Sequence, residues 1–160
     1  MPRGTVQIET RLRRGDKAKV IRRTEAAADE YAEKVQGLVM RTARRIERAA
    51  KVNLESDPRR IDTRNLRRSI QVALLRSAGH YLQARIGSDV KYSIYVHEGT
   101  GIHARGGDGR KTPWVYFDER REQYVVTRGM KPNTFLLDAW KSEIDNFKRD
   151  LRQIKIDAPA

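Results

Sequence analysis

Apolar residues recur at spacings of three and four from about Asp16 to Leu54, and this period predicts one long amphipathic helix. The apolar stripe consists of Ala28, Tyr31, Ala32, Val35, Leu38, Val39, Ala43, Ile46 and Ala50. The segment 24–53 alone would make a rod of roughly 45 Å at the helical rise. Because this is longer than a small sheet needs as cover, we expect one end to project or to pack on a neighbouring subunit.

The pattern then changes to short elements. Residues 62–70 predict a second, short helix with Leu66 and Ile70 on one face. Residues 71–75 suit a strand, and the alternation over 81–86 predicts a second one, antiparallel to the first and joined to it near residues 77–79. The helical spacing of Tyr92, Tyr95 and Val96 predicts one or two helical turns over 91–98.

Glycine and proline divide the rest of the chain. Gly99 and Gly101 end the turn at 91–98, and residues 100–112 form a glycine-rich loop. Residues 113–128 predict a β-hairpin. The last helix opens at 132–134 with Asn133 or Thr134 as its cap. Its apolar stripe consists of Phe135, Trp140, Ile144, Phe147, Leu151 and Ile154. We expect a shared core of Tyr95, Val96, Phe135, Leu136 and Trp140.

The chain of 160 residues fits a single domain. We expect residues 1–15 to be a flexible basic arm or an edge strand, residues 16–156 to form one α+β domain, and residues 157–160 to be a disordered tail. No apolar stretch approaches the roughly 20 residues that span a bilayer, so no membrane partner is expected.

The chain is strongly basic, with 34 Lys and Arg against 21 Asp and Glu and a formal net charge of +13. Such a charge serves either a polyanionic partner or simple solvation, and charge alone leaves both open. The basic run of the first helix includes Arg41 and Lys51, but Glu47 interrupts it and no aromatic residues suited to base stacking are interleaved. This favours a solvated or intersubunit face over a nucleic-acid site.

The residue types that commonly act in catalysis do not form recognised motifs in this sequence. There is no cysteine and no GxSxG. His97 and His103 are six residues apart, which does not match the spacing of four in helical zinc motifs. Residues 105–111 are glycine-rich, but Pro113 and a predicted strand follow where a phosphate-binding loop needs a helix. We therefore expect no catalytic, metal or cofactor site and no enzyme activity.

Four ordered segments resemble the gene-product-ten-like tail-component family of long-tailed bacteriophages. The first contains Asp62-Thr63, Leu66 and Ser69-Ile70, the second is Ile86-Gly87-Ser88, the third contains Tyr92, Tyr95-Val96 and Glu98-Gly99-Thr100, and the fourth contains Gly129, Lys131-Pro132, Phe135-Leu136 and Ala139. The motif and core residues are Thr63, Leu66, Ile70, Tyr92, Tyr95, Val96, Glu98, Gly99, Thr100, Gly129, Pro132, Phe135 and Leu136. The resemblance covers roughly residues 20–155.

The resemblance implies a long N-terminal helix and a C-terminal helix packed on a small, mainly antiparallel sheet with a protruding hairpin. It also implies a virion protein that assembles in the host cytoplasm into a homo-oligomeric ring, of six copies, at the head–tail junction. Its expected partners are the neck proteins (stopper or adaptor) and the tail terminator or tail-tube protein, with non-specific contact to packaged DNA.

Loops on a rigid scaffold are where functional contacts concentrate. The candidate interface residues are Arg105, Arg110, Lys111, Trp114, Arg120, Arg121, Arg44, Arg45 and Arg48. A small basic nucleic-acid-binding protein is the alternative function.

Overall fold

A computed structural model describes residues 14–56, 64–76, 82–119 and 121–155, with only the backbone described at 14–17 and 74–76. The elements in order are α1 (Arg14–Glu55), α2 (Arg64–Ser69), β1 (Gln71–Arg76), β2 (Leu82–Gly87), α3 (Ser93–Glu98), η2 (Gly101–His103), β3 (Trp114–Asp118), β4 (Gln123–Thr127) and α4 (Phe135–Gln153). The predicted α+β class is confirmed. The expected arm, apart from the helical residues Arg14 and Gly15, and the expected tail lie outside the described residues.

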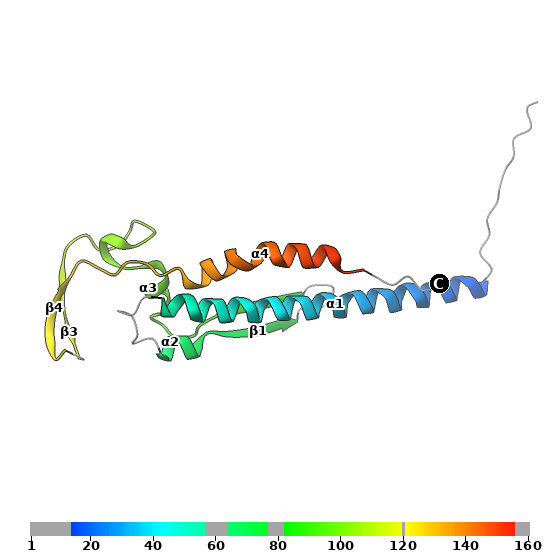
Figure 1. The fold of residues 1–160 in the computed structure, drawn as a ribbon, viewed down its shortest axis with the longest axis horizontal. Helices are drawn as coiled ribbons and strands as arrows, with labels where there is room; N and C mark the ends of the chain where they lie inside the picture. The colour runs from blue at the N-terminus through cyan, green and yellow to red at the C-terminus, as the bar shows by residue number, and fades with distance from the viewer. Residues whose placement is uncertain (1–13, 57–63, 77–81, 120, 156–160) are drawn as a thin grey trace, which may run out of the picture.

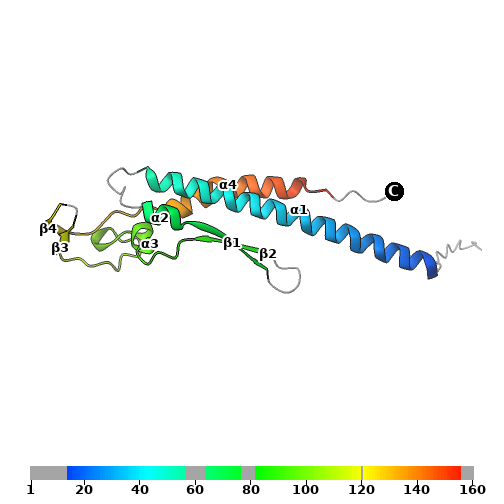
Figure 2. The same cartoon turned by 90° about the horizontal axis from the view of Figure 1, so that it is seen from below.

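The helix α1 lies between α4 on one side and the β1–β2 sheet on the other (Figures 1 and 2). The strands β1 and β2 pair antiparallel with Gln71 opposite Gly87. The strands β3 and β4 form a separate antiparallel pair with Trp114 opposite Thr127. This second pair is the expected hairpin, and it protrudes at one end of the molecule (Figure 1). The predicted joint near residues 77–79 lies outside the described residues.

Only the C-terminal part of α1 is covered. Its buried side chains begin at Leu38. Lys34 Nζ donates to the backbone oxygen of Lys155 at 3.1 Å, so the end of the described chain lies beside α1 one turn before Leu38. Residues 18–33 are mostly exposed and extend past α4 (Figure 1). The prediction that one end of the helix projects is therefore confirmed, and the first part of its apolar stripe is left without cover.

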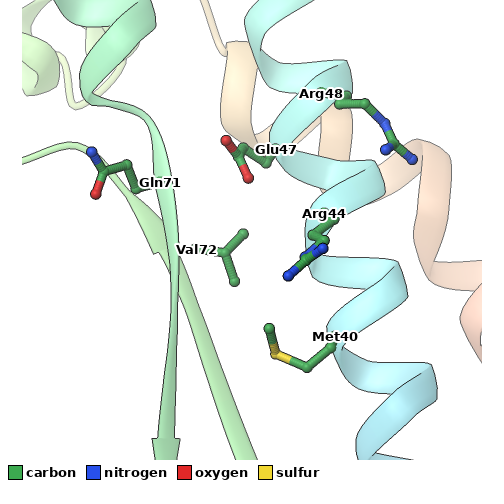
Figure 3. Close-up of a pocket in the computed structure, with 6 residues that line it drawn as sticks. All are labelled: Met40, Arg44, Glu47, Arg48, Gln71 and Val72. Atoms are coloured by element: carbon green, nitrogen blue, oxygen red, sulfur yellow. The ribbon is translucent and has the colours of Figure 1, made fainter.

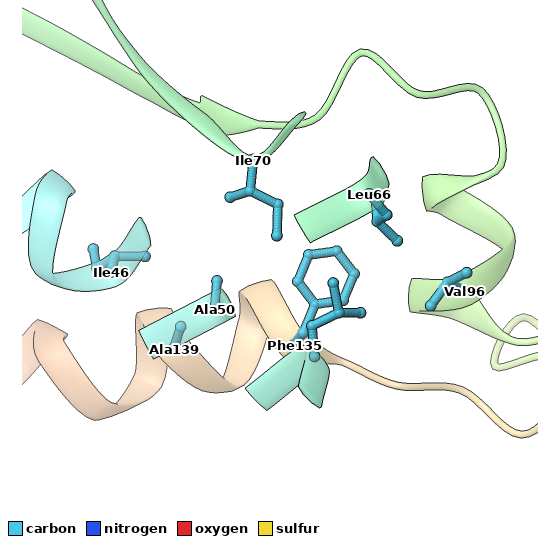
Figure 4. Packing of buried hydrophobic residues seen from close by; sticks show 8 residues of the cluster. Ile46, Ala50, Leu66, Ile70, Val96, Phe135 and Ala139 are labelled. Carbon is cyan, nitrogen blue, oxygen red and sulfur yellow. The ribbon is translucent and has the colours of Figure 1, made fainter. Parts of the chain in front are cut away.

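The core lies where α1, α2, α3 and α4 meet (Figure 4). Its members are Ile46, Ala50, Leu54, Leu66, Ile70, Val96, Phe135 and Ala139. Leu66 and Ile70 are fully buried, as their spacing predicts. In β2, Leu82, Ala84 and Ile86 are the less exposed residues of the alternating pattern, which confirms their shared face.

The prediction that five residues share the core is wrong for two of them. Val96 and Phe135 are buried and Leu136 packs against the core, but Tyr95 is 60% exposed and Trp140 is 47% exposed. Tyr95 is adjacent to the buried Val96 and points about 100° away around the helix. Trp140 follows Phe135 by five residues, which turns it about 140° from the buried face.

The start of α4 matches the prediction in position. Thr134 is the N-cap residue, but its side chain makes no capping hydrogen bond to the backbone. Its hydroxyl instead donates to Asp138 Oδ2 at 2.6 Å, one turn into the helix.

Candidate assembly surfaces

Two segments that are distant in the sequence run side by side at the base of the hairpin. We call residues 99–101 and 128–130 the glycine clasp. Thr100 N donates to the oxygen of Met130 at 2.9 Å, and Met130 N donates back to Thr100 Oγ1 at 2.9 Å. Ile102 N donates to the oxygen of Arg128 at 3.0 Å. These bonds fix the root of both the loop and the hairpin.

Glycine is required in the clasp because the backbones approach so closely. A Cβ at Gly101 would lie 1.9 Å from the oxygen of Arg128, and a Cβ at Gly129 would lie 2.0 Å from the oxygen of Thr100. Both residues also have positive φ angles, of 61° and 122°. Any side chain at either position would force the two segments apart.

The clasp is tied to the helices on either side of it. Asn133 N donates to the oxygen of Val96 at 2.9 Å, which links the segment before α4 to α3. Arg105 N donates to the oxygen of Glu98 at 3.0 Å. The Glu98 carboxylate lies 2.7 Å from His97 Nδ1 and 3.7 Å from the Arg105 guanidinium. Glu98 and Thr100 are thus positioned to hold the loop rather than to meet a substrate.

The first and second motif segments also contact each other. Ser69 Oγ, at the end of α2, is 2.6 Å from Ser88 Oγ, and Ser88 Oγ accepts from Val90 N at 3.1 Å. Together with the burial of Leu66 and Ile70, these contacts show that the described residues of the first two segments support the fold. Thr63 lies outside the described residues. Tyr92 is exposed, as Tyr95 is, so these two motif residues do not belong to the core.

The hairpin carries an apolar face without cover. Cross-strand pairing sets Val115 opposite Val126 and Phe117 opposite Tyr124, so these four side chains share one side. Their exposed fractions run from 49% for Phe117 to 77% for Tyr124. The rings of Phe117 and Tyr124 meet edge to face at 5.3 Å. We call these four residues the hairpin face. A two-stranded hairpin is marginal by itself in water, so this face is a candidate contact surface.

The candidate cations that the structure describes in the loop and hairpin are exposed, and they make contacts within these two segments. The Arg110 guanidinium lies over the Trp114 ring at 5.5 Å. Lys111 Nζ donates to the oxygen of Gly107 at 2.6 Å. Arg121 Nε is 3.7 Å from Asp118 Oδ2. Arg120 lies outside the described residues. Their role as interface residues stays a prediction, and the sequence did not indicate their contacts within the loop.

The three candidate arginines of α1 separate into two groups. Arg45 points toward α4, with its Nε 3.0 Å from Glu143 Oε2 and its Nη2 3.4 Å from Asp150 Oδ2. We therefore assign Arg45 to the contact between α1 and α4. Arg44 and Arg48 are exposed.

Arg44 and Arg48 border an open cleft of about 450 Å³ between α1 and β1. Figure 3 shows Val72 of β1 directed toward α1, with Met40 and Arg44 beside it and Arg48 turned away from the strand. Glu47, also on this cleft, is paired with Lys51 one turn later. The cleft combines cations with apolar side chains, which suits an acidic protein face.

A second hollow, of about 380 Å³, is mostly apolar. We call it the apolar groove. It is lined by Ile46 of α1, Ala84 and Ile86 of β2, His97 of α3, and Leu136 and Trp140 of α4. His97 Nε2 is buried there and has no hydrogen-bond partner among the described residues. Sequence reasoning missed this groove, because β2 and α4 are brought together only by their common packing on α1.

Two further findings concern the described residues only. They contain no group of three or more His, Asp or Glu side chains that could hold a metal ion. None of their helices combines the length and apolar character needed to cross a membrane.

In the described residues, motif side chains build a scaffold, and apolar and basic side chains of the hairpin and of α1 remain exposed. The chain belongs to the family described as "Bacteriophage HK97-gp10, putative tail-component", whose model matches residues 7–99. The match includes the first two motif segments and the third as far as Gly99, while the hairpin and the fourth segment follow it. No curated protein and no solved structure gives a match. The protein is thus a structural tail component of a bacteriophage virion.

Proposed function

We propose that the protein completes the tail by forming a symmetric ring, of six copies, at the head–tail junction. Membership of a tail-component family supports the virion role. The observation that supports a ring is the position of the exposed surfaces on the protomer. The projecting residues 18–33 of α1 lie at one end of the molecule and the hairpin at the other (Figure 1).

The two ends differ in chemistry. The projecting helix is charged, with Val20, Ile21 and Tyr31 exposed among its polar residues, whereas the hairpin face is apolar. Different surfaces at opposite ends favour contacts between unlike patches of successive copies. Such heterologous contacts generate a ring when their rotation closes.

A ring of this kind would contact the neck protein (stopper or adaptor) on the head side and the tail terminator or tail-tube protein on the other. The exposed Arg44 and Arg48 would serve such protein contacts, with packaged DNA touched only non-specifically. Assembly in the host cytoplasm follows from this role.

A joining assay tests the proposal. Phage lacking this chain should yield filled heads and separate tails, counted by electron microscopy. Purified protein added to that lysate should restore joined particles. Joined, infectious particles formed without the chain would contradict the proposal.

The alternative function, a small basic nucleic-acid-binding protein, predicts a different result in a second assay. A joining protein binds DNA weakly and with a steep loss of affinity as salt rises. A dedicated DNA-binding module binds tightly at physiological salt and does not restore joining.

A further inference from the structure

We infer that the apolar groove receives the hairpin face of the neighbouring copy. The inference rests on the proposed ring and specifies the contact that its hairpin end makes. The groove and the hairpin lie in different parts of the protomer, so the contact is heterologous, as ring formation requires.

The groove resembles a part of the hydrophobic core that no side chain of the same chain fills. Its base is Ile46, which is almost fully buried, and its rim is the half-exposed Trp140. The indole contributes a large apolar surface that this chain leaves in contact with water. Aromatic residues in such positions are typical anchors of protein interfaces. The groove therefore suits an apolar occupant rather than a charged one.

The hairpin face is the matching occupant on the same chain. It offers two aliphatic and two aromatic side chains on one side of a narrow two-stranded ribbon. The hairpin protrudes at one end of its own protomer (Figure 1). A second copy can supply it without any change in the protomer.

Cysteine cross-linking tests the contact cleanly, because the chain has no cysteine of its own. The test chain carries both Ala84→Cys in the groove and Val126→Cys on the hairpin face. Tails assembled with this chain are treated with a short bismaleimide linker and denatured. We expect a ladder of covalent oligomers that ends at the ring size, and only monomer from either single variant.

The matched control combines Ala84→Cys with Val52→Cys, a valine of similar exposure on α1 (65% against 69% for Val126). It should give no ladder. Absence of a ladder from the test chain, a ladder from the control, or dimers from a single variant would each overturn the inference. Treatment of wild-type tails with an amine cross-linker separates the two proposals. If the amine cross-linker joins copies of the chain but the cysteine pair gives no ladder, only the groove contact is rejected. If the amine cross-linker joins no copies, the ring itself is rejected.

Discussion

At the scale of single residues, most of the described motif residues pack or hydrogen-bond within the protomer. Leu66, Ile70, Val96 and Phe135 fill the core, and Thr100 and Gly129 close the clasp. Helical spacing predicted correctly that Leu66 and Ile70 share a face. It could not predict that Tyr95 and Trp140 remain exposed, because spacing tells which residues lie together on a helix and not which side the same chain covers.

The close approach in the clasp leads to a prediction about stability. Gly101→Ala and Gly107→Ala both place a side chain at a positive φ, but only Gly101 faces a backbone atom, since a Cβ at Gly107 meets nothing within 4 Å. Gly107→Ala should cost about 1–2 kcal/mol of unfolding free energy at most. Gly101→Ala should cost clearly more, as measured by chemical denaturation. Equal losses would mean that the clasp opens without penalty.

The core makes a second prediction at this scale. Phe135 is 4% exposed and belongs to the same core cluster as Leu66 and Val96 (Figure 4). Phe135→Ala should lower the unfolding free energy by about 3–5 kcal/mol, because it removes a buried ring and leaves a cavity. Trp140→Ala, at the half-exposed rim, should cost much less in the isolated protomer. A near-neutral Phe135→Ala would contradict the described core.

At the scale of elements, most of the secondary structure could be predicted from the sequence. The period of three and four gave α1 within two residues of its observed ends, and proline and glycine marked the hairpin and the start of α4. The pairing of residues 99–101 with 128–130 could not be predicted. It depends on backbone hydrogen bonds across a long separation, and local pattern carries no information about such contacts.

The contact between α1 and α4 depends partly on Arg45. Its ion pairs with Glu143 and Asp150 are partly exposed, so we expect a modest contribution. A double-mutant cycle of Arg45→Ala with Glu143→Ala should give a coupling energy of about 0.5–1 kcal/mol that decreases with added salt. The neighbouring Arg44 paired in the same cycle with Glu143 is the control and should show none. Coupling unaffected by salt would speak against an ion pair.

At the scale of the whole molecule, the protein is an elongated scaffold with uncovered surfaces at its two ends. The described core is small, and much apolar surface is exposed. The proposed function gives the basic charge two separable uses, contact with protein partners and contact with DNA.

Charge reversal separates these uses. Arg44→Glu combined with Arg48→Glu should reduce head–tail joining at least several-fold while leaving the unfolding free energy nearly unchanged, because both side chains are exposed. Arg149→Glu with Arg152→Glu on α4 is a matched reversal away from the cleft and should join normally. Loss of tight DNA binding with normal joining in the first variant would favour the nucleic-acid alternative.

If copies of this chain form a closed ring where the head meets the tail, cryo-electron microscopy of the virion neck will show six copies around the tail axis, each in contact with the next. A neck in which this chain is absent, or is present as copies that do not touch one another, would contradict it.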